Sequence, residues 1–299
     1  MPYSIYVWLF LHSVIKIEKY DLNDYLIFSI NIIKMNNLKI SIITVCYNSE
    51  DLIEETVKSV LQQTYENLEY VVVDGNSKDS TMDILSQYEE KISVLVSEPD
   101  KGIFDAMNKG IDLCTGDWCL FLNSGDYLYS EDSIRKAVAL FDESADVIYG
   151  DTEYRFDYGK EVFPPLPLEK VMDGAFCCHQ STFFKTGTLR NYKYDLSYRI
   201  VADWVLLRTM YLDKCKFHYI NTIVSSYDNT VGASTASSIK SYIKHETEKA
   251  RCKGIDRSIL WKVKMWCGAF TFYTRRKLSS LIPNSLYNKL KKIWIHIHR

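Results

Sequence analysis

The residue best placed to do chemistry is a carboxylate, Asp126, which stands just after the apolar segment 118–122. A continuous apolar run of this length, bounded by polar residues, predicts a strand buried on both faces, and open α/β sheets bind ligands at the carboxyl ends of such strands. An Asp beside Gly125, which allows close approach of the backbone, suits a hard divalent cation and its phosphate ligands. The alternative is an ordinary turn in which Asp126 caps the next helix.

Two further strand ends carry polar residues. Tyr47 and Asn48 follow one β-branched, apolar segment, and Asp74 follows another. In a parallel sheet such ends lie along one edge, so these side chains should converge on one cleft. There Asp74 can accept the imide N–H of a uracil, Tyr47 can stack on its ring, and Asp126 can hold a cation that bridges a diphosphate. Asp and Gly after strands are also ordinary turn chemistry. Neither a P-loop nor a dinucleotide fingerprint occurs.

The elements that must position these groups alternate from Leu38 onward. Asn48 or Ser49 is placed to cap the first helix, and Asp79 or Ser80 the second. The alternation predicts a Rossmann-like, mainly parallel sheet with helices on both faces and right-handed crossovers. Strands are expected at 39–46, 68–73, 92–96 and 118–122, and helices after 49, at 80–88, at 102–113 and at 131–141.

Several of these segments resemble the family 2 glycosyltransferases. The opening motifs of that family are similar to Ile-Ile-Thr-Val-Cys-Tyr-Asn at 42–48, Ser-Val-Leu-Gln-Gln-Thr-Tyr at 59–65 and Val-Asp-Gly-Asn-Ser-Lys-Asp-Ser-Thr at 73–81. The segment Glu-Pro-Asp-Lys-Gly-Ile-Phe-Asp-Ala-Met-Asn-Lys-Gly at 98–110 resembles the polysaccharide-assembly, colanic-acid-type branch. The resemblance extends from about Lys39 to Tyr227.

This resemblance implies a GT-A fold that binds a nucleotide sugar, usually a UDP-sugar, together with Mg²⁺ or Mn²⁺. It implies that Tyr47 and Asp74 contact the base and that Lys101 lies near the nucleotide. The motif residues assigned to the same nucleotide-sugar site are Thr44, Asn48 and Asn108.

The predicted metal site departs from the family pattern. Asp126 ends the segment equivalent to the Asp-x-Asp metal motif, but Asn123 and Ser124 leave it as the only carboxylate there. We therefore expect the cation to bind mainly through the diphosphate, or weakly. His179 is a second candidate ligand, since neutral imidazole binds such cations. A hydrogen-bonded core histidine is the alternative.

The catalytic candidate is Asp203, at the start of the apolar segment 204–207. The resemblance places the family's catalytic carboxylate in a matching Asp before a helix. Inverting sugar transfer needs a base that removes the proton of the acceptor hydroxyl, and a partly buried carboxylate can serve. A helix-capping Asp is the alternative, and both roles are compatible.

Composition and charge divide the chain. Residues 240–299 hold 15 Lys/Arg against 3 Asp/Glu, whereas residues 1–239 hold 21 against 35. A basic, amphipathic tail at 229–299 with Trp side chains predicts contact with a membrane surface or a lipid-linked acceptor. Packing against the catalytic domain is the alternative. No stacking platform or recognition module accompanies the charge, so nucleic acid is not an expected partner.

The predicted organisation has three parts. Residues 1–37 form an N-terminal extension whose apolar runs fall short of a membrane span, and translation starting at Met35 is one interpretation of it. The GT-A domain covers 38–228, with a nucleotide-sugar half at 38–157 and an acceptor half at 158–228. The tail covers 229–299, and its small-residue loop at 229–235 is a candidate lid. Eight scattered Cys predict buried thiols in a reducing, cytoplasmic location. The basic tail predicts that this location is at the inner face of the cell membrane.

These observations predict an inverting, metal-assisted sugar transferase acting on a glycan or lipid-linked acceptor. Two alternatives stay open. A sugar-phosphate nucleotidyltransferase would require a Gly-rich, basic loop after the first strand. The sequence there, Tyr47-Asn48-Ser49-Glu50, does not provide one. A non-catalytic nucleotide-sugar-binding assembly subunit is suggested by the incomplete metal motif.

Overall fold

The computed structural model describes residues 38–230, 238–256 and 258–279, together with 286, 289, 290 and 292. The predicted N-terminal extension, with the proposed start at Met35, lies outside the described residues. So do residues 231–235 of the predicted lid and most of the chain after 279.

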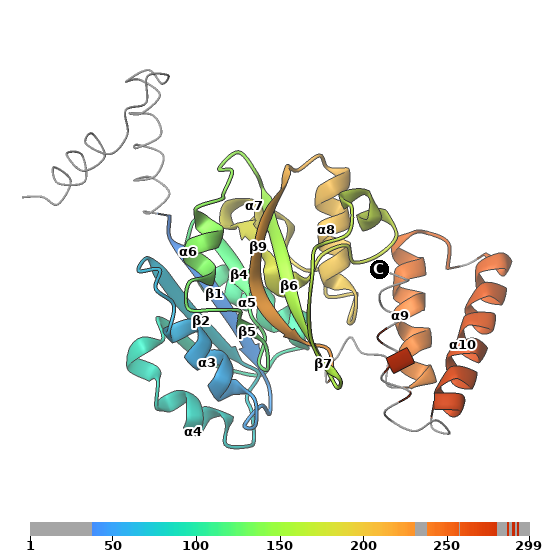
Figure 1. Cartoon of the computed structure of the whole chain (residues 1–299), viewed down its shortest axis with the longest axis horizontal. Helices are drawn as coiled ribbons and strands as arrows, with labels where there is room; N and C mark the ends of the chain where they lie inside the picture. Colours follow the sequence, from blue (N-terminus) through green and yellow to red (C-terminus); the bar gives the residue numbers. More distant parts are fainter. Residues whose placement is uncertain are drawn as a thin grey trace, which may run out of the picture. The chain divides into compact units, whose positions relative to one another are not determined.

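A sheet of nine strands organises the described chain (Figure 1). Its order is β3-β2-β1-β4-β8-β6-β9-β5, with β7 paired to β6. The first four strands are all parallel, whereas β8 runs antiparallel to both β4 and β6. The strands are β1 (Ile40–Cys46), β2 (Leu68–Asp74), β3 (Val94–Ser97), β4 (Trp118–Phe121), β5 (Tyr127–Leu128), β6 (Val147–Phe156), β7 (Gly159–Phe163), β8 (Thr182–Lys185) and β9 (Phe217–Asp228).

The helices follow the predicted alternation in the first half of the domain (Figure 1). Strands β5 to β9 and the tail helices complete the second half, which the alternation alone does not describe. The pairings of these strands are antiparallel except for that of β6 with β9. The helices are α3 (Ile53–Leu61), α4 (Thr81–Ser86), α5 (Ile103–Leu113), α6 (Ser133–Val138), α7 (Thr186–Tyr192), α8 (Ala202–Leu212), α9 (Ile239–Cys252) and α10 (Ile259–Ser279).

The prediction that Asn48 or Ser49 caps the first helix is wrong, because α3 begins only at Ile53. Asn48 has a left-handed backbone with φ 48°, and its side-chain oxygen accepts a hydrogen bond from the Lys78 N–H at 2.8 Å. The side chain therefore ties two loops together instead of capping. The carbonyl of Ser49 accepts the N–H groups of residues 52 and 53, so a turn precedes the helix.

One large apolar core fixes the position of the catalytic candidate. On one face of the sheet, β1 and β2 contribute Val45 and Val73, which pack in the same cluster as residues of α5, α7 and α8. Strand side chains alternate between faces, so every second residue of β1 and β2 enters this core. Gly110 lets α5 approach the sheet, since a Cβ there would clash with Ile43. Burial of Trp204 next to Asp203 anchors the first turn of α8.

The tail helices α9 and α10 lie side by side (Figure 1). They approach closely where Gly268 of α10 faces the Tyr242 hydroxyl of α9. Among the described residues, no helix has both the length and the apolar character needed to cross a bilayer.

Candidate active site

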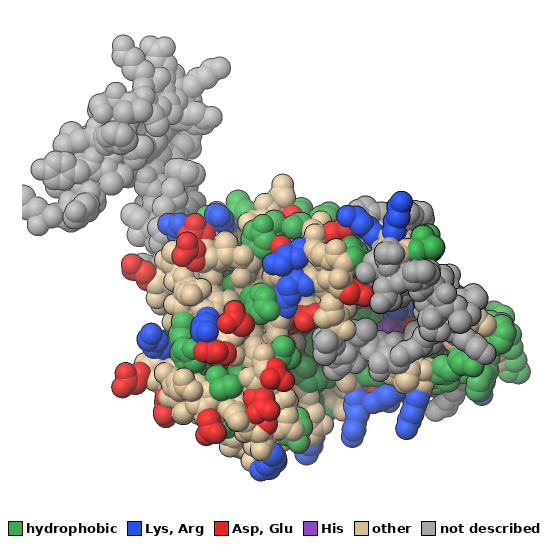
Figure 2. Space-filling model, turned by 60° about the horizontal axis from the view of Figure 1, so that its bottom comes forward, with side chains coloured by type: hydrophobic (Ala, Val, Ile, Leu, Met, Phe, Trp, Pro, Cys, Tyr) green, Lys and Arg blue, Asp and Glu red, His purple; other side chains and the backbone are tan. Residues whose placement is uncertain are grey.

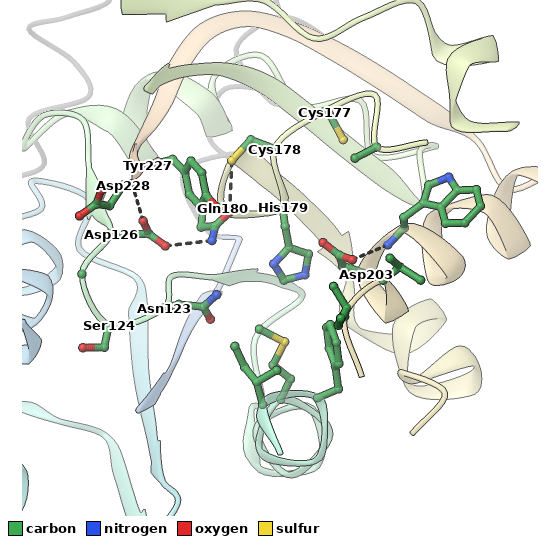
Figure 3. Close-up of a pocket in the computed structure, with 18 of the residues that line it drawn as sticks. Asn123, Ser124, Asp126, Cys177, Cys178, His179, Gln180, Asp203, Tyr227 and Asp228 are labelled. Carbon is green, nitrogen blue, oxygen red and sulfur yellow. Dashed lines mark hydrogen bonds between the residues drawn. The ribbon is translucent and has the colours of Figure 1, made fainter. Parts of the chain in front are cut away.

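A cavity of about 430 Å³ opens beside the carboxyl end of β4. It is lined from several distant parts of the chain, and Figure 3 shows Asp126 and Asp203 on opposite sides of it with His179 between them. Three of the predicted site residues therefore share one cavity. The lining segments are 103–107, 123–126, 175–180, 199–204 and 227–228, with contributions from Leu52, Tyr154, His245 and Lys249.

Asp126 lies almost fully buried at the floor of this cavity, 5% exposed. Its two oxygens accept hydrogen bonds from the Gln180 side-chain amide and from the backbone N–H of Asp228, each at 2.9 Å. Burial raises the pKa of Asp126 to about 7, and these bonds and the nearby Arg155 only partly oppose the rise. An incoming cation would compensate this desolvated carboxylate directly.

Two side-chain oxygens of the turn before Asp126 have no partner among the described residues. The side-chain oxygens Asn123 Oδ1 and Ser124 Oγ are buried and have no hydrogen-bond partner in the described structure. Buried polar atoms nearly always have partners, so an unpaired pair beside a carboxylate calls for an explanation. Carboxylate, amide and hydroxyl oxygens are the ligands that Mg²⁺ and related hard cations take. The residues that replace the first acid of the motif therefore still offer oxygen donors.

Protein groups alone do not complete a metal site. Within the described ranges, no three His, Cys, Asp or Glu side chains are grouped so that they could hold a metal ion. A cation bound by Asp126 would therefore need further oxygens from the neutral side chains and from a phosphate ligand.

Asp228 and Arg155 were not predicted, although Asp228 lines the cavity and Arg155 contacts both Asp228 and the turn that carries Asp126. Arg155 donates to the carbonyl of Gly125, lies 3.8 Å from Asp228 Oδ2 and stacks 3.8 Å above the Tyr127 ring. These contacts fix the turn between β4 and β5 that carries Asp126. Both residues come from long strands, β6 and β9, where no local motif marks them.

His179 lies at the centre of the cavity wall and is 8% exposed. One ring nitrogen, Nε2, is 2.6 Å from the Tyr194 hydroxyl, and the ring stacks on Phe121 with centroids 5.1 Å apart. Burial lowers the pKa of His179 to about 4, so the imidazole is neutral at physiological pH. The remaining prediction is that this neutral ring binds a cation or phosphate.

Asp203 lies in the first turn of α8, across the cavity from Asp126 (Figure 3). One carboxylate oxygen accepts the N–H of Trp204 at 2.8 Å. The indole N–H of Trp204 donates to the carbonyl of Val171 at 2.6 Å, which anchors this turn. Burial raises the pKa of Asp203 above its ordinary value, toward the range of a general base.

The first tail helix forms part of this site. Glu248 of α9 is 7% exposed, and its carboxylate accepts the N–H groups of Arg199, Ile200 and Val201 at 2.9–3.3 Å. These three residues lead directly into α8, so α9 holds the segment before Asp203. Two other side chains of the same helix, His245 and Lys249, line the cavity. Helix α9 therefore packs against the catalytic domain, which was the alternative predicted for the tail.

The other predicted nucleotide-sugar residues lie outside the lining of this cavity. Thr44 is fully buried and its hydroxyl accepts from Tyr70 at 3.1 Å. The amide of Asn108 exchanges two hydrogen bonds with the backbone of Tyr194, at 2.8 and 2.9 Å. The Lys101 N–H donates to Asp105 at 3.0 Å.

Tyr47, Asn48 and Asp74 gather in a neighbouring loop cluster. Tyr47 is 59% exposed, whereas Asp74 is fully buried. The N–H of Asn48 donates to the Ser77 hydroxyl at 2.8 Å, and Ser77 in turn hydrogen-bonds Asp74. Tyr47 and Asp74 therefore do not line the cavity that holds Asp126, and the predicted convergence of all three residues on one cleft is not seen there.

Two solved structures have a similar fold. S. aureus TarS residues 1–349, in complex with UDP-GlcNAc, aligns with a TM-score of 0.58 and 21% identity over 72% of this chain and 66% of that chain. The mannosyltransferase PcManGT from Pyrobaculum calidifontis, in complex with GDP-Man and Mn²⁺, aligns with a TM-score of 0.56 and 14% identity over 90% and 88% of the two chains. The fold is therefore of the GT-A type.

Sequence comparison gives the family. The profile of glycosyl transferase family 2 matches residues 41–213. A PGL/p-HBAD biosynthesis glycosyltransferase of Mycobacterium bovis (strain BCG / Pasteur 1173P2) is 31% identical over 236 residues, 76% of this chain and 90% of that protein. The putative teichuronic acid biosynthesis glycosyltransferase TuaG of Bacillus subtilis (strain 168) is 41% identical over 107 residues, 34% of this chain and 42% of that protein. The chain belongs to glycosyl transferase family 2, which confirms the predicted enzyme class over a nucleotidyltransferase.

Proposed function

We propose that this glycosyltransferase moves a sugar from a UDP-sugar to a glycan or lipid-linked acceptor, with inversion at the anomeric carbon. The observation that carries the proposal is the position of two carboxylates, the buried Asp126 and the partly buried Asp203, on opposite sides of one cavity. One carboxylate is available to the donor phosphates and the other to the acceptor. A similar protein bound to UDP-GlcNAc supports the uridine nucleotide, and a teichuronic acid relative supports a glycan product.

In the proposed reaction, Asp203 acts as general base. Its carboxylate accepts the proton of an acceptor hydroxyl while that oxygen forms a bond to the anomeric carbon. The bond from the anomeric carbon to the donor phosphate breaks, and the nucleoside diphosphate leaves with the bonding electrons. The raised pKa of Asp203 matches this task, because a base works best when its pKa approaches the working pH.

The donor side is proposed to hold Mg²⁺ or Mn²⁺. Asp126 would bind the cation, with Asn123 Oδ1 and Ser124 Oγ as neutral donors and His179 as the predicted further ligand. A bound cation stabilises negative charge on the leaving diphosphate. The complex of PcManGT with GDP-Man and Mn²⁺ supports a divalent cation in this fold. Asp228 adds a second carboxylate at the same wall.

A ligand screen tests the proposed donor. Thermal unfolding is measured with a panel of UDP-, GDP-, CDP- and dTDP-sugars, each with and without Mn²⁺. Ligands that bind only the folded state raise its melting temperature. We expect a uridine nucleotide to stabilise the protein, and more strongly with Mn²⁺. Indifference to every nucleotide sugar would reject the proposal.

We also propose that α10 contacts the inner face of the cell membrane. Its apolar residues Ile259, Leu260, Val263, Trp266 and Phe270 are 56–81% exposed. Figure 2 shows hydrophobic side chains gathered at the α10 end of the molecule, with Lys and Arg side chains on the adjoining surface. Exposed apolar and basic side chains on one helix fit an anionic lipid surface, which would bring a lipid-linked acceptor to the cavity.

A further inference from the structure

The loop after β3 carries a carboxylate that the proposed donor site has not used. Gly75, at the end of β2, has no side chain, and a Cβ built there would lie 2.5 Å from Asp100 Oδ2 and 3.3 Å from Cδ2 of the Tyr47 ring. The Asp100 carboxylate therefore lies in the space that any other residue at position 75 would fill. It also lies beside the exposed aromatic ring at the end of β1.

The loop holds Asp100 in a fixed orientation. Asp100 Oδ1 accepts the N–H of Gly102 at 2.7 Å. The loop is held on the N-terminal side of Asp100, because the N–H of Glu98 donates to the carbonyl of Asp74 at 3.0 Å and Lys109 Nζ donates to the carbonyl of Pro99 at 2.8 Å. Oδ2 makes no hydrogen bond in the described structure, so one acceptor oxygen stays available beside Tyr47.

Asp74, by contrast, already has its partners. One oxygen accepts from the Ser77 N–H at 2.9 Å and from the Ser97 hydroxyl at 2.6 Å. The other accepts from the Ser77 hydroxyl and lies 3.7 Å from the Cys46 thiol. The Asp74 side chain is fully buried, so a nucleobase could form a hydrogen bond to it only after these bonds break. This is the environment of a residue that positions loops.

We propose that Asp100 recognises the uracil base of the donor through its imide N–H, with Tyr47 stacked on the ring and Gly75 providing the space. The proposal rests on the proposed function and refines its donor site. Asp100 Oδ2 accepts the N3–H of uracil in a charge-assisted hydrogen bond. Asp74 acts as a positioning residue that ties the loops after β2 and β3 together.

Calorimetric titration with UDP and with 3-methyl-UDP, which lacks the N3–H, tests the assignment. The wild-type protein should bind UDP more tightly than 3-methyl-UDP. Asp100→Ala should weaken UDP binding by about 10- to 100-fold and abolish the discrimination, as expected for loss of a hydrogen bond to a charged group. Gly75→Ala should act in the same direction by displacing the carboxylate, and Asp83→Asn, an exposed carboxylate on α4, should change neither affinity.

The two proposals fail differently. If the wild-type protein binds UDP and Asp100→Ala binds it equally well, the assignment of Asp100 is wrong and the proposed function stands. The assignment of Asp100 is also wrong, and the proposed function again stands, if a folded Asp74→Asn no longer distinguishes UDP from 3-methyl-UDP while Asp100→Ala still does. If the wild-type protein binds no uridine nucleotide, the proposed function falls and the assignment falls with it.

Discussion

In the proposed mechanism, the chemistry depends on two carboxylates that the fold withdraws wholly or partly from water. Asp126 and Asp203 are both buried enough for their pKa values to rise, yet both line an open cavity. Burial of a charge is costly unless a partner compensates it. On the donor side a cation would supply that compensation, and on the acceptor side a proton taken from the substrate would do so.

The unpaired oxygen of Ser124 gives a prediction about the cation. Ser124→Ala should raise the Mn²⁺ concentration needed for half-maximal UDP binding several-fold, because one oxygen donor is lost. It should leave the free energy of unfolding nearly unchanged, since Ser124 Oγ has no partner within the described structure. Titration of Mn²⁺ in the presence of UDP measures the first effect and urea unfolding the second. Ser130→Ala, at a partly buried position before α6, is the control for the Mn²⁺ titration, and an equal Mn²⁺ requirement in both variants would exclude Ser124 as a ligand.

At the scale of the elements, the site is built where a parallel half-sheet meets an antiparallel one. The four parallel strands end in the loops that carry Tyr47, Asp74 and Asp126. Strand β9 then brings Asp228 to the same edge, where its N–H bonds Asp126. Helix α9 holds the segment before Asp203, where Glu248 accepts three consecutive backbone N–H groups.

The contact between Glu248 and the backbone of residues 199–201 can be tested directly. Glu248→Gln removes a buried charge that accepts several N–H groups, so the free energy of unfolding should fall by about 1–3 kcal/mol. Glu246→Gln on the same helix should cost less than about 1 kcal/mol, because its ion pairs are partly exposed. Urea denaturation of the three proteins measures both values. Equal midpoints for wild type and Glu248→Gln would show that α9 does not hold the segment before Asp203.

The sequence was informative wherever a residue's role follows from its own segment. The parallel strands, α5 and the positions of Asp126 and Asp203 could be predicted because a buried strand or an apolar helix begins or ends there. Asp228, Gln180 and Glu248 could not, because their contacts depend on pairings between residues 47 to 102 positions apart. Only the three-dimensional structure brings such residues together.

For the whole molecule, charge and apolar surface are unevenly distributed. Acidic residues exceed basic ones before residue 240, and the reverse holds after it. Figure 2 shows acidic side chains spread over the end of the molecule away from α10. A molecule divided in this way would approach an anionic membrane with its tail helices, and each basic residue near the lipid surface adds about 1 kcal/mol of attraction.

Vesicle sedimentation tests this orientation. The full chain should bind vesicles containing anionic phospholipid more strongly than purely zwitterionic vesicles, and high salt should weaken the binding. Trp266→Glu should reduce binding at least tenfold, because it places a negative charge on the exposed apolar face of α10. Leu140→Glu, another exposed apolar position, is the control. Equal binding of both variants would argue against α10 as the membrane contact.

The most direct measurement of the central claim is sugar transfer by Asp203→Asn, compared with Asp213→Asn at the exposed end of α8. If Asp203 is the general base, Asp203→Asn loses about 10²- to 10⁴-fold in turnover while its Kd for UDP stays that of the wild type. In the wild-type protein, turnover should also fall as the pH drops through the raised pKa of Asp203, because the protonated acid cannot accept a proton. Turnover by Asp203→Asn within about threefold of the wild type would contradict the account.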